Sequence, residues 1–385
     1  MSKPVLHLSA TPYPSPQGTQ ALVREMLEAS HAQGDVPELL TYAHGGHGPR
    51  GSFPLHRLKG GPQLSSLRSG PSLGKALLDL RMIDATRRLF RRLGARAVVA
   101  HNVEAALIAR ASGIRPWVYV AHTSFEDELP SYASARLRRP LTLAGKTLDA
   151  LAVGGAQAVV TVAPALTQRL SGLCPRAQTL LPPWPRATPT SSQERAQARQ
   201  ALGIARGAEV LLYAGNLDAY QGWEDVLTAL ASLARRRPAA RLLVATASAT
   251  QPLWRLARSL GQAHRLTATT LTTEDARRRA YAAADIALVP RRIAGGVPIK
   301  LLDALARQTP VVTTARAAAG LPLGGACLLV ADDDPEALAR GCERILNHRE
   351  LGERLTTSGS LYLEARHSPH LFAKELSSLV RSLTR

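Results

Sequence analysis

The sequence has 385 residues, 45% of them hydrophobic, and its 48 Lys and Arg residues against 29 Asp and Glu residues give a formal charge of +19. This composition is globular, and the length predicts two domains of ordinary size. The three cysteines, Cys174, Cys327 and Cys342, have no metal-like spacing, so we expect neither a disulfide nor a zinc site. No apolar run reaches about 18 residues, and the first residues lack the pattern of a signal peptide. We therefore expect a soluble, cytoplasmic protein.

The positive charge indicates a partner that carries phosphate or another anionic group. The arginines are spread over many predicted helices, and we interpret clusters such as residues 277–279 as solvated helix faces. Aromatic residues make up only 4% of the chain, which leaves few stacking surfaces for single-stranded nucleic acid. An anionic membrane surface or an anionic substrate is therefore favoured over DNA or RNA.

The first half alternates apolar, strand-like runs with helical patterns, which is typical of βαβ wiring. Helices are expected at residues 20–33 and 76–92, and strands at residues 5–10, 38–43, 97–101, 117–122 and 158–163. This order predicts a parallel, doubly wound sheet. Two of the strands end at His101 and His122, and ligands of such sheets bind outside the carboxyl ends of the strands.

A proline-rich stretch between residues 182 and 189, followed by Ser and Thr residues, predicts an interdomain linker over residues 185–203. The alternation then restarts. Helices are expected at residues 223–236 and near 252–261, and strands at residues 209–215, 241–247, 285–290 and 310–314. We expect domains at residues 1–184 and 204–360, and a closing helix at residues 361–385 that crosses back to the first domain.

Residues 287–314 form the most informative stretch, which reads as strand, glycine loop, helix and strand. Gly295 and Gly296 permit close approach of the backbone to a ligand, and Pro298 suits the first turn of a helix. The N-terminus of that helix attracts anions, and Lys300 and Asp303 lie three residues apart on its first turn. A lysine there could meet a phosphate while the carboxylate accepts hydrogen bonds from sugar hydroxyls, so the loop predicts a nucleotide-sugar site.

Several short motifs together resemble the GT-B glycosyltransferases, particularly glycosyltransferase family 4. The resemblance covers nearly the whole chain. Its carriers are residues 16–20 (PQGTQ), 101–104 (HNVE), 122–130 (HTSFEDELP), 213–222 (YAGNLDAYQG) and 295–306 (GGVPIKLLDALA). The implied fold is two Rossmann-like domains that face a central cleft, with the acceptor in the first domain and the nucleotide sugar in the second.

In the second domain the resemblance implies a donor site that consists of Gly215, Asn216, Gln221, Gly295, Gly296, Lys300 and Asp303. Family members usually carry two glutamates here, one toward the sugar and one toward the ribose. Asp303 keeps the second carboxylate in shortened form, whereas Gly295 replaces the first. Asn216 and Gln221 stand where many members have arginine and lysine, and neither supplies the charge that stabilises a departing diphosphate. We therefore expect Lys300, with Arg291 and Arg292 close to it in the sequence, to be the main electrostatic stabiliser.

In the first domain the resemblance implies a glycine loop at Gly18, near donor phosphate or acceptor, and a histidine at His122, near the reacting sugar. Glu126, Asp127 and Glu128 are candidates to orient an acceptor hydroxyl or to act as a base. The same acidic run is typical of a solvated first turn of a helix. For His101, a structural role as a packing or hydrogen-bonding residue is as well supported as a functional one.

The sequence thus predicts a glycosyltransferase that moves a sugar from a nucleotide diphosphate sugar to an acceptor, with retention and with neither a metal nor a covalent enzyme intermediate. The acceptor class suggested by the basic surface is a lipid-linked or cell-envelope glycan at the inner face of a membrane. Two alternatives stay open: a sugar-nucleotide epimerase of the same architecture, and a noncatalytic nucleotide-sugar-binding protein.

Overall fold

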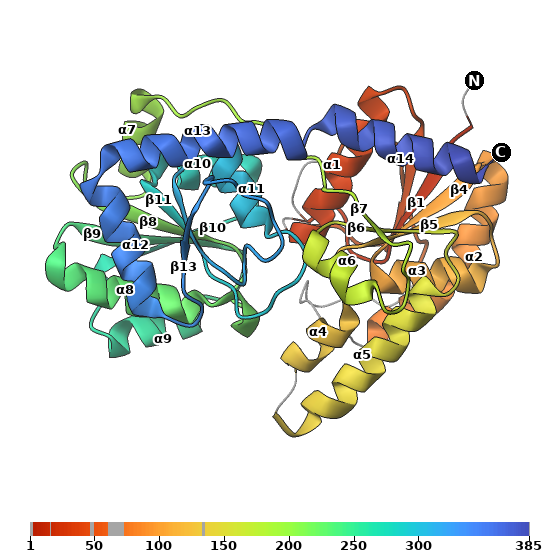
Figure 1. The fold of residues 1–385 in the computed structure, drawn as a ribbon, viewed down its shortest axis with the longest axis horizontal. Helices are drawn as coiled ribbons and strands as arrows, with labels where there is room; N and C mark the ends of the chain where they lie inside the picture. Colours follow the sequence, from red (N-terminus) through yellow and green to blue (C-terminus); the bar gives the residue numbers. More distant parts are fainter. Residues whose placement is uncertain (1–2, 16, 47–49, 61–72, 133–134, 385) are drawn as a thin grey trace. The chain divides into compact units, whose positions relative to one another are not determined.

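The computed structural model describes residues 3–15, 17–46, 50–60, 73–132 and 135–384. It divides into two compact units (Figure 1). Unit 1 contains the residues through Pro183 together with those from His367 onward, and unit 2 contains Trp184–Arg366.

Unit 1 is built on a parallel sheet whose described strands lie in the order β3-β2-β1-β4-β5-β6-β7. The strand bounds are β1 Val5–Ser9, β2 Pro37–Thr41, β3 Leu55–Arg57, β4 Ala97–His101, β5 Trp117–Ala121, β6 Ala158–Thr161 and β7 Gln178–Thr179. The central strands are fully buried, which explains why they read as continuous apolar runs rather than alternating ones. All strands run in the same direction, so their carboxyl ends meet at one edge.

Two sets of helices enclose this sheet (Figure 1). Helices α1 and α14 pack against each other on one side, and α2, α3 and α5 form a packed set on the other. The helix bounds are α1 Gly18–Ala32, α2 Leu73–Leu93, α3 Asn102–Ser112, α4 Phe125–Glu128, α5 Arg138–Val153, α6 Pro164–Leu170 and α14 Pro369–Leu383. The end of the chain therefore belongs to the same unit as its beginning.

Unit 2 repeats the architecture with described strands in the order β10-β9-β8-β11-β12-β13, again all parallel. The strands are β8 Glu209–Ala214, β9 Ala240–Thr246, β10 Leu266–Thr270, β11 Ile286–Val289, β12 Val311–Thr314 and β13 Leu328–Val330. The helices are α7 Ser192–Ala201, α8 Trp223–Arg236, α9 Gln251–Ser259, α10 Glu274–Ala283, α11 Ile299–Ala306, α12 Pro335–Asn347 and α13 Arg349–Arg366. Helices α8 and α12 pack together, as do α7 with α10 and α11 with α13.

The predicted fold class, two doubly wound parallel sheets, is confirmed. Most of the expected strands and helices occur within a few residues of their predicted bounds, and α8 matches residues 223–236. The single closing helix expected at residues 361–385 is instead divided between the end of α13 and α14, which begins at Pro369 after its N-cap residue Ser368. The strands that the sequence did not predict, β3, β7, β10 and β13, are short or lie at sheet edges, and they lack a long apolar run. Helices α5, α6, α10 and α12 were also missed.

Helix α7 lies inside residues 185–203, the stretch expected to form a linker, and it is part of unit 2. Ser191 and Glu194 form a capping box at its start, in which each side chain bonds the backbone N–H of the other residue. Its Arg199 is buried, donates to the carbonyls of residues 206, 208 and 283, and pairs with Asp285 at 2.7 Å. These bonds fasten the helix to the sheet of unit 2.

Candidate functional site

The candidate donor site of unit 2 begins in the loop that follows β8. Tyr213, the fifth residue of that strand, donates a 2.6 Å hydrogen bond from its hydroxyl to the Asn216 carbonyl. The Asn216 side-chain amide in turn donates to Asp218 at 2.8 Å. The loop ends at Gly222, whose φ of 67° is a left-handed conformation that favours glycine and directs the chain into α8. Gln221 lies half-buried just before that turn.

The second loop of this site joins β11 to α11. Pro298 directly precedes the helix in an extended conformation rather than within the first turn as predicted. Arg291 closes the loop by donating a 2.7 Å hydrogen bond to the Gly296 carbonyl. Neither Gly295 nor Gly296 has a positive φ, so they do not serve here through unusual backbone angles. A Cβ atom on Gly295 would lie 3.4 Å from the Arg291 guanidinium, so the missing side chain leaves room for that arginine.

Lys300, in the first turn of α11, connects the two loops. Its ammonium lies 4.1 Å from the centre of the Tyr213 ring, and a Cβ atom on Gly215 would be only 3.3 Å from the same nitrogen. Lys300 is 9% exposed, and its Nζ is buried without a hydrogen-bond partner among the described residues. Burial lowers the pKa of Lys300 well below its ordinary value, and the nearby Arg291 charge lowers it further, whereas Asp218 acts in the opposite direction. An anion bound beside this nitrogen would accept its hydrogen bonds and would stabilise its protonated form.

Asp303, one turn further along α11, is paired with Arg277 of α10. The Arg277 guanidinium donates to Asp303 Oδ2 at 2.6 Å, and the two side chains are only 12% and 10% exposed. The carboxylate raises the pKa of Arg277, against the desolvation that would lower it. The interpretation of residues 277–279 as a solvated helix face is therefore wrong for Arg277, because this arginine faces the site.

The two arginines near Lys300 differ in their surroundings. The Arg291 guanidinium lies 5.9 Å from the centre of the Tyr220 ring, and its positive charge lowers the pKa of Lys300. Arg292 instead pairs with Asp225 at 3.1 Å and Glu224 at 3.5 Å on α8, so its charge is largely balanced. The structure thus brings Gly215, Lys300 and Arg291 together.

In unit 1, three neighbouring strands hold a row of three buried histidines, two of them at strand ends. His122 follows β5, and its Nε2 lies 3.1 Å from His101 Nδ1 at the end of β4. His101 Nε2 lies 3.1 Å from Nδ1 of His7, which belongs to β1. Nδ1 of His122 is buried without a hydrogen-bond partner among the described residues. Burial lowers the pKa of His7 and of His122 to about 3, and it lowers that of His101 well below its ordinary value. The sequence analysis did not identify His7.

The acidic residues after His122 lie in α4, and their side chains form ion pairs and hydrogen bonds with residues of unit 1. The buried Asp149 accepts hydrogen bonds from the Ser124 hydroxyl and from the backbone N–H groups of Phe125 and Glu126. The Arg169 guanidinium makes a bidentate ion pair with the Asp127 carboxylate and lies 3.9 Å from the Glu126 carboxylate. Glu128 accepts from the hydroxyls of Thr123 and Tyr132 at 2.7 Å. The run therefore has clear structural roles, and the assignment of Glu126 or Asp127 as a base stays a prediction.

The predicted glycine loop of unit 1 leads directly into a helix. Gly18 is the exposed first residue of α1, and Pro16 of the same motif lies outside the described residues. Within the described ranges, no group of three or more His, Cys, Asp or Glu residues is arranged to hold a metal ion. None of the helices over those ranges is long and apolar enough to cross a bilayer.

Each unit matches a model of a known protein family. A family model for glycosyl transferases group 1 matches residues 208–348, and one for glycosyltransferase family 4 matches residues 16–184. D-inositol 3-phosphate glycosyltransferase of Corynebacterium diphtheriae is 30% identical over 171 residues, which are 42% of this chain and 39% of that protein. The chain spans no more than half the length of the curated relatives it matches.

Solved structures agree in fold over the full length. Sucrose-phosphate synthase from Thermosynechococcus elongatus has a TM-score of 0.81 at 20% identity, covering 99% of each chain. HepE from Anabaena, solved in complex with UDP and glucose, has a TM-score of 0.76 at 15% identity, covering 100% of each chain. The two family models together match most of both units, so the chain carries a glycosyltransferase family 4 domain in its first half and a glycosyl transferases group 1 domain in its second, on the fold of the GT-B glycosyltransferases.

Proposed function

We propose that the protein transfers a sugar from a nucleotide diphosphate sugar, bound in unit 2, to an acceptor bound in unit 1, with retention of anomeric configuration. The donor is a substrate, and no cofactor or metal takes part on this account. No residue is assigned as a nucleophile. The activity is proposed to take place in the cytoplasm, and the acceptor to be a lipid-linked or cell-envelope glycan.

The observation that carries this proposal is the buried, unpartnered ammonium of Lys300 beside Gly215. A buried amine without a hydrogen bond is costly, and an anionic phosphate at this point would both satisfy its donors and favour its charged form. The N-terminus of α11 adds a positive partial charge at the same place. HepE, with the same fold, was solved with UDP, which supports a nucleoside diphosphate as part of the ligand.

Lys300 and Arg291 would supply the charge that Asn216 and Gln221 lack. Both cations lie near the Tyr213–Asn216 loop, so a leaving diphosphate between the loops would meet two positive charges. Charge that develops on the leaving group is stabilised most strongly in a site that excludes water. For Asp303 we assign Oδ1 to the ribose hydroxyls, since Oδ2 receives Arg277.

The first experiment measures thermal shifts against a panel of nucleoside diphosphates and nucleotide sugars, because a ligand that binds the native state raises apparent stability by mass action. A selective shift that disappears in Lys300→Met, and persists in the exposed control Lys374→Met, supports the donor site. Loss of the shift in both variants, or no shift from any nucleotide, contradicts it.

A noncatalytic role in nucleotide-sugar binding is favoured by one observation, the replacement of three charged family positions by Asn216, Gln221 and Gly295. Transfer of labelled sugar to membrane-extracted acceptors separates the two functions. Label on an acceptor establishes transfer. A thermal shift without transfer supports binding alone, and a new nucleotide sugar without an acceptor product indicates the epimerase.

The proposed membrane-linked acceptor fits a surface of helix α5, which carries exposed leucines among basic residues. Leu137, Leu143 and Leu151 are 55%, 68% and 41% exposed, and Arg138, Arg139 and Lys146 are exposed on the same segment. Apolar and basic side chains on one helix are typical of contact with an anionic bilayer surface. We assign this surface to peripheral contact at the inner face of the membrane.

Sedimentation with anionic vesicles tests that contact. Binding should weaken as salt rises, because attraction between exposed charges is screened over roughly 10 Å at 0.1 M ionic strength. Leu143→Glu should reduce binding, whereas Leu361→Glu, a similarly exposed leucine on α13, should not. Equal binding by both variants would remove α5 from the assignment.

A further inference from the structure

Three imidazoles form a continuous hydrogen-bonded row on one face of the unit 1 sheet. His7 is in β1, His101 ends β4 and His122 follows β5, and these three strands are neighbours in the sheet. The His7 and His101 rings are stacked with centroids 5.4 Å apart, and the His101 and His122 rings meet at 62° at the same centroid distance. Each contact joins a nitrogen of one ring to a nitrogen of the next at 3.1 Å.

The row couples the tautomers of its members. A neutral imidazole has one N–H donor and one acceptor nitrogen, so each contact needs a donor on one side and an acceptor on the other. Only two neutral arrangements satisfy both contacts. Either all three rings carry the proton on Nε2, or all three carry it on Nδ1. Burial, which lowers the pKa of every ring in the row, favours these neutral arrangements over charged ones.

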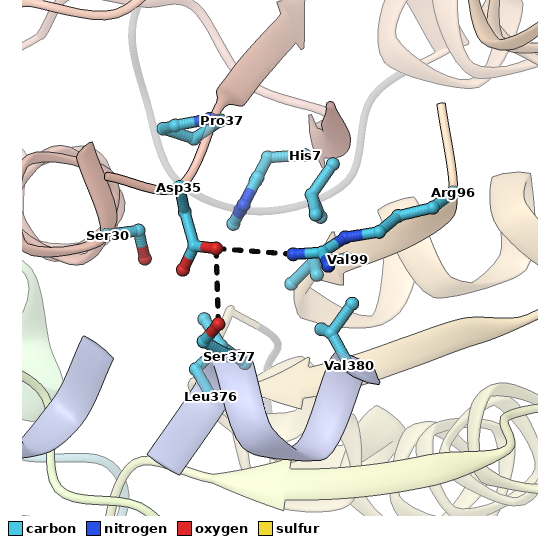
Figure 2. Close-up of a pocket in the computed structure, with 10 residues that line it drawn as sticks. His7, Ser30, Asp35, Pro37, Arg96, Val99, Leu376, Ser377 and Val380 are labelled. Carbon is cyan, nitrogen blue, oxygen red and sulfur yellow. Dashed lines mark hydrogen bonds and ion pairs between the residues drawn. The ribbon is translucent and has the colours of Figure 1, made fainter. Parts of the chain in front are cut away.

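The two ends of the row distinguish these arrangements. Nδ1 of His7 contacts His101, so its Nε2 is the other end of the row. His7 lines a cavity of about 10 Å³, which is the lower limit for holding one water molecule. Figure 2 shows the His7 ring pointing into this cavity, on the side of Asp35. The Asp35 carboxylate there accepts from Arg96 at 3.2 Å and from the Ser377 hydroxyl at 3.1 Å. A carboxylate or a water at this end can accept a hydrogen bond from the Nε2–H group.

At the other end, Nδ1 of His122 is buried and has no partner among the described residues. With the protons on Nδ1, this end would be an orphaned buried donor, which is rarer in proteins than an unsatisfied acceptor. With the protons on Nε2, Nδ1 of His122 carries a lone pair and is an unsatisfied acceptor. Both ends therefore favour the Nε2 arrangement.

We propose that His7 and His101 are positioning residues that hold His122 in its Nε2–H tautomer, so that Nδ1 of His122 presents a lone pair to a hydroxyl group of a bound ligand. Identification of that hydroxyl as one of a sugar rests on the proposed function. The row selects a ligand group that can donate, and it disfavours an anionic oxygen, which has no proton to give.

The test is nitrogen NMR of the imidazole rings in the full-length, ¹⁵N-labelled protein without ligand. His367 provides an internal reference for the opposite tautomer. Its Nδ1 lies 2.7 Å from the Pro182 carbonyl oxygen, which can only accept a hydrogen bond, so Nδ1 of His367 carries the proton. Variants His122→Gln and His101→Gln assign the signals. We expect His122 to show a protonated Nε2 and an unprotonated Nδ1, the reverse of His367.

Two variants of His7 then separate positioning from packing. In His7→Phe the Nε2–H of His101 loses its acceptor, so either arrangement of the remaining two rings leaves one buried donor and one buried acceptor unsatisfied. The preference should therefore be lost, and His122 should show a mixture of the Nε2–H and Nδ1–H tautomers. In His7→Gln the amide oxygen can replace the lost acceptor and should restore the original tautomer. Thr86→Val, which removes a buried hydroxyl elsewhere in unit 1, should change nothing.

A protonated Nδ1 of His122 in the unaltered protein overturns the proposal, as does a His122 tautomer that is the same in His7→Phe as in the unaltered protein. If His7→Phe does not fold, the pattern in the unaltered protein and in His7→Gln still decides. Because every readout is the tautomer of the free protein, a failure here is distinct from a failure of sugar transfer.

Discussion

The guanidinium of Arg277 and the carboxylate of Asp303 form a shielded ion pair at 2.6 Å, which joins α10 to the first turns of α11. Both side chains are close to 90% buried, so neither charge is compensated well by water. Removal of one partner of such a pair is much more costly than the pair itself is stabilising. The pair therefore couples Asp303, the residue to which we assign the ribose of the proposed donor, to a helix that the family motif does not include.

Arg277→Gln should lower the free energy of unfolding by about 3 kcal/mol, the cost typical of an uncompensated buried charge. It should also weaken nucleotide binding, because Asp303 loses the group that orients it. Urea denaturation and nucleotide titration measure the two effects. The matched control is Arg278→Gln on the same helix, whose side chain is 63% exposed and which should change stability by no more than about 0.5 kcal/mol. Equal losses in both variants would contradict the burial argument.

Lys300 should make the stability of unit 2 depend on alkaline pH. Its pKa is lowered in the folded protein, so at pH values between that lowered pKa and the ordinary value of 10.5 the unfolded chain binds more protons. Stability therefore rises with pH across this window. Urea midpoints measured from neutral pH up to about pH 10 should increase in the unaltered protein and should show a smaller increase in Lys300→Met.

The same lysine should take up a proton when a nucleotide diphosphate binds, because the phosphate favours its charged form. Calorimetric titration in two buffers of different ionisation enthalpy measures this uptake. Lys300→Met should abolish it. Uptake of the same size in the variant would assign the proton to another group.

Arg199 should be the main anchor of α7. Arg199→Ala leaves Asp285 half-satisfied and removes the bonds to three backbone carbonyls, so it should destabilise unit 2 by about 3–5 kcal/mol. Arg195→Ala, which also removes a bond to Asp285 but from a side chain that is 40% exposed, should cost about 1 kcal/mol or less. Similar urea midpoints for the two variants would show that α7 is not fastened in this way.

Gly145 of α5 should tolerate no side chain, because a Cβ atom there would overlap the Phe125 carbonyl and lie 2.7 Å from the Glu126 nitrogen. Gly145→Ala should destabilise unit 1 by about 1–3 kcal/mol through overpacking. The neighbouring Lys146→Ala, at an exposed position, should stay within about 0.5 kcal/mol of the unaltered protein. Thermal unfolding distinguishes them, and an unaffected Gly145→Ala would mean that α4 can move away from α5.

The fold and the loops of the candidate donor site could be predicted because their signals are local. Apolar runs of strand length mark β1, β4, β5 and β8. The loop before α11 and the first turns of that helix carry the glycines, proline, lysine and aspartate within nine residues. His101 and His122 could be placed at strand ends for the same reason.

His7 and Arg277 could not be found in this way, since their partners are distant in sequence. His7 lies in a strand and contacts a residue 94 positions later, and nothing in the run VLHLS marks that contact. Arg277 lies among other arginines on a polar helix, where periodicity predicts exposure, yet the packing of α10 turns it toward Asp303 26 positions later. Tertiary contacts of this kind are set by the topology and not by local pattern.

The placement of α14 in unit 1 has a consequence for how the protein is made. A ribosome delivers residues 1–183 before unit 2 and α14 after it. Until α14 emerges, the surface of α1 that packs on α14 and the Asp35–Arg96 pair that meets Ser377 face water. Unit 2, a continuous segment, can complete its core before then. The first domain in sequence is thus the last to finish folding, and a chain truncated shortly before α14 would leave an apolar face open to chaperones and proteases.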